Sequence, residues 1–124
     1  MNTRPSVSDP LWDAEQDRAP FRWRPARLGR QAESKERGAS LFEVPSGAAT
    51  LPLRPHRANE EMVVVLVGRP TLRTTDGERE LAEGEVVSFP TGRRGSHRLE
   101  NRTDGPVRIL VVSTMIGPDA VEQP

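Results

Sequence analysis

Four side chains in two short segments have the types and spacing for ligand or metal chemistry: Arg54, His56, Glu61 and His97. Imidazole and carboxylate groups can coordinate a divalent metal, whereas a guanidinium stays protonated and only donates hydrogen bonds. Residues two apart on a strand face the same side, so positions 54 and 56 should point together. If Glu61 enters from the next strand and His97 from a later one, the four side chains can converge on one point.

These residues lie in two ordered motifs that begin at glycines. The motifs run Gly47-AATLPLRPHRANEEMVVVLV-Gly68 and Gly84-EVVSFPTGRRGSHRLE-Asn101. In this order, and with the short spacer 69–83 between them, they resemble the paired motifs of the cupin superfamily over roughly residues 38–114. The resemblance implies an all-β fold, a cupin-type double-stranded β-helix or jelly-roll barrel, of the small single-domain microbial kind.

The resemblance also implies a metal site, and one position departs from it. Family members with a complete set hold a divalent transition metal through three histidines and a glutamate. By position, His56, Glu61 and His97 match this set, and Arg54 stands where the first histidine would be. The remaining two-histidine, one-carboxylate set could hold Fe, Mn, Ni or Zn in a degenerate site.

The orientation of Arg54 decides between several arrangements of this site. Arg54 can turn inward and pair with Glu61, which would replace the charge of a metal. It can instead turn away and leave the three ligands intact. Further arginines near the motif ends could ring the barrel mouth and attract a carboxylate or phosphate, or could simply be solvated surface: Arg57, Arg93, Arg94 and Arg98.

Two functions from different classes follow. The first is a binding module whose pocket holds a carboxylate-bearing small molecule through Arg54, His56 and His97, with little or no catalysis. The second is a metal-dependent dioxygenase, isomerase or lyase. A structural or regulatory protein with an inactive pocket is a third. Because one fold carries many chemistries, the sequence names neither a substrate nor a reaction.

The elements that must position these residues are short strands. Runs of β-forming residues are separated by turn residues, and this regular spacing indicates an antiparallel sandwich or barrel. Asp76-Gly77 between two runs predicts a hairpin. The predicted strands are 40–44, 48–53, 61–67, 71–74, 78–81, 85–89, 97–101 and 107–114.

The chain divides into an N-terminal extension (1–37), the barrel (38–115) and a C-terminal tail (116–124). The extension holds both tryptophans, and its segment 21–24 alternates apolar and charged residues as a half-buried strand does. We expect it to pack on the barrel or on a neighbouring subunit. Runs 61–67 and 107–114 are apolar on both faces, so the outer face also needs cover, from the extension, the second sheet or another copy. A homodimer is therefore expected.

Composition excludes several other functions. The 18 basic and 18 acidic residues balance, which argues against binding to nucleic acid or to acidic membranes. The absence of cysteine rules out disulfides and thiolate metal sites. Neither a signal-peptide core nor a membrane-spanning apolar segment is present, so a cytoplasmic protein with a small-molecule ligand is expected.

Overall fold

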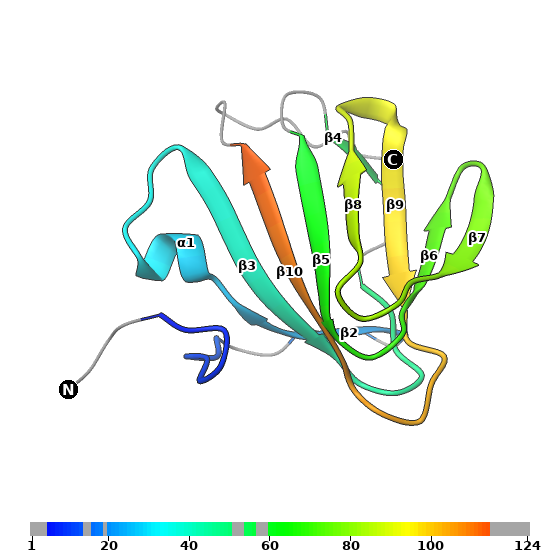
Figure 1. Ribbon diagram of the computed structural model, residues 1–124, viewed down its shortest axis with the longest axis horizontal. Coiled ribbons are helices and arrows are strands. Elements are labelled where there is room, and N and C mark those ends of the chain that lie inside the picture. Colours follow the sequence, from blue (N-terminus) through cyan, green and yellow to red (C-terminus); the bar gives the residue numbers. More distant parts are fainter. Residues whose placement is uncertain (1–4, 14–15, 19, 51–53, 57–59, 115–124) are drawn as a thin grey trace.

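The computed structural model describes residues 5–13, 16–18, 20–50, 54–56 and 60–114, and for 16–18, 21, 54–56 and 92–95 it describes the backbone. The elements are almost all strands (Figure 1). In chain order they are β1 (Gln16–Arg18), β2 (Phe21–Ala26), α1 (Leu28–Gln31), β3 (Arg37–Val44), β4 (Arg54–His56), β5 (Glu61–Val67), β6 (Thr71–Thr74), β7 (Gly77–Glu80), β8 (Val86–Phe89), β9 (Gly92–Glu100) and β10 (Val107–Thr114).

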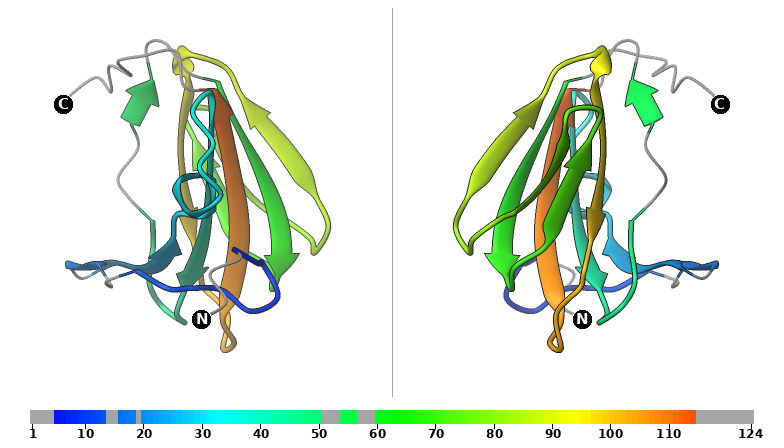
Figure 2. Two further views of the ribbon diagram at one scale, coloured as in Figure 1. Left: turned by 90° about the vertical axis from the view of Figure 1, so that its left-hand side faces the viewer. Right: turned by 90° about the vertical axis from the view of Figure 1, so that its right-hand side faces the viewer.

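The strands form two antiparallel sheets. A six-stranded sheet has the order β1-β2-β3-β10-β5-β8, and a four-stranded sheet has the order β4-β9-β6-β7. From β3 onward the chain passes back and forth between the sheets, with the β6–β7 hairpin as the one step within a sheet among the described strands. This exchange between two facing sheets is the jelly-roll arrangement that the motifs predicted. Figure 2 shows the sheets from two sides.

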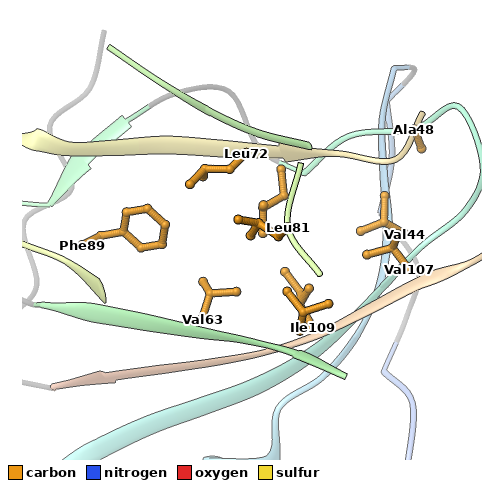
Figure 3. Close-up of a cluster of buried hydrophobic side chains, with 10 residues drawn as sticks. Val44, Ala48, Val63, Leu72, Leu81, Phe89, Val107 and Ile109 are labelled. Atoms are coloured by element: carbon orange, nitrogen blue, oxygen red, sulfur yellow. The ribbon is translucent and has the colours of Figure 1, made fainter. Parts of the chain in front are cut away.

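The strand pattern explains the core. Along β5, Val63 and Val65 are each 1% exposed, whereas Met62 is 38% exposed, so alternate residues enter the core. Burial of each such side chain stabilises the fold by about 1.5–3 kcal/mol. Both sheets contribute to one buried cluster (Figure 3), which consists of Val44, Ala48, Val63, Val65, Leu72, Leu81, Phe89, Leu99, Val107 and Ile109.

The last residue of each motif has a structural role. Gly68 has a φ of 88°, and a Cβ there would lie 2.7 Å from the carbonyl oxygen of Pro106, so only glycine fits. Asn101 is 1% exposed, and its Nδ2 donates to the carbonyl oxygens of Val44 and Gly105. Its Oδ1 accepts from the backbone N–H of Thr103. Asn101 therefore fixes a turn, as expected from a residue outside the chemistry.

The N-terminal extension adds β1 and β2 to the six-stranded sheet and covers part of its outer face. β2 pairs with β3, and the one-turn helix α1, which the sequence did not predict, follows it. A second apolar cluster there joins Ala26 and Leu28 to Leu41, with Trp12 packed against them. The expectation that the extension packs on the barrel is thus confirmed.

Trp12 contacts two arginines. The guanidinium carbon of Arg24 lies 4.4 Å from the indole centroid, and that of Arg108 lies 5.3 Å from it. Both arginines also meet Glu43, at 3.9 Å and 2.8 Å respectively. The contact of Trp12 with Arg108 and the pair of Arg24 with Glu43 therefore join the extension to the barrel.

The extension leaves part of the outer face uncovered. Leu66 and Leu110 pack against the second cluster, but Met62 and Val86 are 38% and 53% exposed. Met62 lies at the start of β5, in register with Ser88 of β8, and Val86 is in register with Val64. The homodimer that the sequence predicted for this face stays a prediction.

The opposite, outer face of the four-stranded sheet carries a charge network around Glu100. Arg102 donates to Glu100 at 2.6 Å and also pairs with Glu78, while Arg98 lies 2.8 Å from Glu100. Partial burial raises the pKa of Glu100, but the hydrogen bond from Arg102 and the charges of Arg98 and Arg102 outweigh it. The pKa of Glu100 is therefore lowered in the fold.

We predict that Glu100→Gln destabilises the protein at pH 7, because it weakens the charge-assisted bonds from Arg98 and Arg102. The loss should be only about 1 kcal/mol, because the side chain of Arg102 is 52% exposed to solvent. A carboxyl with a lowered folded pKa stabilises the fold above its unfolded pKa and loses this contribution as the pH falls through the folded value. Urea unfolding should thus show a difference between variant and wild type that shrinks below about pH 4. Glu80→Gln, at an exposed pair with Arg69, is the matched control. A difference that is independent of pH would contradict the prediction.

Candidate functional site

Two of the four residues singled out in the sequence meet between the sheets. Glu61 begins β5, and His97 lies within β9 of the other sheet. Glu61 Oε1 is 3.1 Å from His97 Nε2, and the two side chains are 17% and 13% exposed. Each lies on the inner face of its strand, in phase with Val63 and with Leu99, which are buried in the core. The fold therefore presents a carboxylate and an imidazole nitrogen at one point.

Phe89 completes this arrangement. It ends β8 in register with Glu61, and its ring stacks on the imidazole of His97 with centroids 3.6 Å apart and planes 9° from parallel. Phe89 is 5% exposed, so the core holds the stack in place. His97 thus has one face against Phe89 and its Nε2 against Glu61, which together fix the plane and direction of the ring.

Arg54 and His56 lie on the neighbouring strand. β4 pairs with β9, and the register places Arg54 opposite His97 and His56 opposite Gly92, with an irregularity between the two pairs. The side chains of Arg54 and His56 lie outside the described part of the chain, as do those of Arg57, Arg93 and Arg94. The backbone alone brings position 54 next to His97.

Arg98 belongs to the other face. It neighbours His97 in β9, so its side chain points to the opposite side of the sheet. There it lies 2.8 Å from Glu100, within the charge network. Arg98, one of the four arginines near the motif ends, therefore belongs to the charge network on the outer face of the sheet.

The donor chemistry of Glu61 and His97 suits a divalent metal. A carboxylate oxygen and an imidazole nitrogen are ordinary ligands of Fe, Mn and Zn, and Nε2 is a nitrogen that such ions take. Two protein ligands are fewer than the three of typical catalytic zinc sites. Among the described residues no group of three His, Cys, Asp or Glu side chains is placed to hold a metal. His56, whose side chain lies outside the described part of the chain, could supply a third ligand.

Sequence reasoning missed two residues in register with Glu61, Phe89 and Ser113. Phe89 looked like an ordinary core residue of an apolar run, and its contact with His97 depends on how the sheets face each other. Ser113 ends the inner face of β10, in register with Glu61 of β5. The alternation along 107–114 places Ser113 on the same face as Ile109, which is a signal that could have found it.

Comparison with known families agrees with this architecture. Residues 40–113 match the model of the cupin domain, which is more than half of the chain. Together with the jelly-roll topology and the two motifs, this match places the chain in the cupin family. No curated protein matches the chain by sequence.

Several crystal structures share the fold. A proposed sugar phosphate isomerase from Acidithiobacillus ferrooxidans aligns with a TM-score of 0.79 at 22% identity, over 87% of this chain and 70% of the other. A cupin-superfamily sugar phosphate isomerase from Silicibacter pomeroyi aligns at 0.77 and 28% identity, over 82% of this chain and 65% of the other. A cupin-2 domain protein from Rhodospirillum rubrum aligns at 0.74 and 22% identity, over 98% and 82%.

Among the residues that the structure describes, no helix is long and apolar enough to cross a membrane.

We predict that Phe89→Leu loosens the His97 ring while the fold remains. The substitution should cost about 1 kcal/mol of stability, since it conserves most of the apolar volume. Loss of the stacked ring removes its ring current, so the imidazole proton signals of His97 should move downfield in the NMR spectrum. The chain has only two histidines, and His56→Gln assigns the spectrum. Phe42→Leu, elsewhere in the core, is the matched control and should leave these signals in place. Unchanged His97 signals in Phe89→Leu would contradict the stack.

Proposed function

We propose that this chain is a small-molecule-binding cupin whose pocket takes an anionic ligand through Arg54, His56 and His97. The observation that carries the proposal is the register of β4 and β9, which puts position 54 opposite His97. Directly opposite residues of an antiparallel pair face the same side, with their Cβ atoms about 5 Å apart. The Arg54 guanidinium and the His97 imidazole then form two adjacent donors for one carboxylate or phosphate.

Electrostatics support an anion at this point. The single acidic group that the described residues place against His97 is Glu61, and it already contacts the imidazole. Arg54 adds a permanent positive charge, because a guanidinium does not lose its proton in proteins. A bound anion is one partner that such a charge can take. Arginine also binds planar carboxylates and phosphates with two parallel hydrogen bonds.

The relatives with the same fold are consistent with this ligand class. Two of them are described as sugar phosphate isomerases, one of these as a proposal, and a sugar phosphate is a small anion. At 22% and 28% identity they support the class of ligand and leave the ligand itself to experiment.

The proposal predicts that Arg54→Gln weakens anion binding by about tenfold or more, because it removes a charge-assisted hydrogen bond. Small carboxylates and phosphates are screened by thermal shift, and the affinity of those that stabilise the protein is measured by calorimetry. Arg69→Gln, whose side chain is 67% exposed on the spacer between the motifs, is the matched control. Equal affinity of wild type and Arg54→Gln, or an equal loss in Arg69→Gln, would overturn the proposal.

A second function is favoured by the meeting of Glu61 and His97. With His56 these residues would form a two-histidine, one-carboxylate set, and the chain would be a metal-dependent dioxygenase, isomerase or lyase. A bound metal would supply Lewis acidity or activation of dioxygen. In that case Arg54 points away from the ligands, because its charge would repel a cation there. Phe89 would then keep the His97 nitrogen directed at the metal position.

The two functions differ in metal content. Protein purified without chelator should contain stoichiometric Fe, Mn, Ni or Zn only if the second function holds, and His97→Ala should then lose it. Arg54→His should raise metal affinity, because it removes a charge and adds a ligand. Elemental analysis of wild type and both variants measures this. If Arg54→His leaves the metal affinity of the protein unchanged, Arg54 is not what weakens the metal site.

A further inference from the structure

The inner face of the six-stranded sheet becomes more polar toward the end that holds Glu61. On three adjacent strands, the inward positions are bulky and apolar through the core and become small or polar at this end. On β3 the last two inward positions are Ser40 and Gly38, on β10 the last is Ser113, and on β5 it is Glu61. On these three strands the core residues therefore stop short of this end of the inner face.

The registers place the two serines on this face. Ser113 of β10 pairs with Gly38 of β3 on one side and with Glu61 of β5 on the other. Ser40 pairs with Val111, which packs against the main core. Opposite residues of antiparallel strands face the same side, so both serines share the face of Glu61. Gly38 has no side chain to fill the position beside Ser113.

The hydroxyls of Ser40 and Ser113 are available to a ligand. Both residues are partly buried, and neither hydroxyl has a hydrogen-bond partner within the described part of the chain. Other hydroxyls near the barrel are used: Ser46 donates to the carbonyl oxygen of Thr103, and Thr50 to that of Leu99 at 3.3 Å. Half-buried hydroxyls that the protein leaves unpaired on the same sheet face as a carboxylate are suited to a partner from outside.

We propose that Ser40, Ser113 and the carboxylate of Glu61 recognise hydroxyl groups, so that the ligand is an anion carrying several hydroxyls. The inference rests on the proposed anion site and names its substrate class. Each serine can both donate and accept, and a carboxylate accepts hydrogen bonds from adjacent hydroxyls. A polyhydroxylated anion can bond to the serine hydroxyls, whereas an alkyl anion of equal length leaves these hydroxyls unpaired, which a polar site rejects strongly.

Matched pairs of probes test this inference by calorimetry on the full chain. One pair is D-gluconate and hexanoate, and the other is D-ribose 5-phosphate and pentyl phosphate. Wild type should bind the hydroxylated member of at least one pair more than tenfold more tightly. Ser40→Ala with Ser113→Ala should weaken that member by about fivefold per serine and leave the alkyl anion within about twofold. Ser88→Ala, at an exposed position on the outer face of β8, is the control, and thermal unfolding checks that each variant folds.

The outcomes separate this inference from the proposed function. If wild type binds the alkyl and the hydroxylated anion equally, and Arg54→Gln weakens both, the anion site stands and the hydroxyl recognition is wrong. The same conclusion holds if the serine variant weakens both members of a pair alike. If no member of either pair binds, the proposed function fails and this inference fails with it. Selective loss of the hydroxylated member supports both.

Discussion

The packing of two antiparallel sheets against each other is the constraint on which the rest of this structure depends. Alternation along the strands puts valines, leucines and isoleucine between the sheets, where their burial offsets the entropy lost on ordering the chain. This packing fixes the register of each strand, because a slip of one residue would turn its apolar face outward. It also fixes the distance between β5 and β9, and so brings Glu61 to His97.

The candidate site lies at the end of the apolar core between the two sheets. Past Val63 on β5 the inner face carries Glu61, and the core supports the site with a single aromatic residue, Phe89. Phe89 belongs to both regions, since it is buried in the core and stacked on His97. The polar residues can therefore be exchanged for other chemistry without disturbing the packing that holds the sheets together. This separation explains physically how one architecture supports many activities.

The strands that turn residues bound clearly could be predicted from the sequence. β5, β6 and β10 begin and end where their β-forming runs do. β9 begins at Gly92, five residues before the predicted start, because Arg93, Arg94 and Gly95 carry no apolar signal. Its pairing with β4 and β6 comes from the sheet rather than from local propensity. α1 is a single turn, too short for a helical period to show.

The site was predictable only in part. The motif spacing pointed to Glu61 and His97, and the fold brings them together, but their role as ligands stays a prediction. Phe89 could not be assigned to the site, since its contact with His97 depends on how two sheets approach each other. The importance of Ser113 depends on its register with Glu61, which links strands far apart in the sequence.

Trp12 of the extension contacts Arg108 of β10, so the region that matches the family model, residues 40–113, leaves out segments that pack on the barrel. A fragment cut at Ser40 would lose β2 and leave β3 as an open edge with free backbone donors and acceptors. It would also expose the apolar side chains of Leu41 and Leu110 to solvent. The extension therefore covers a strand edge and an apolar surface that would favour aggregation if they were exposed.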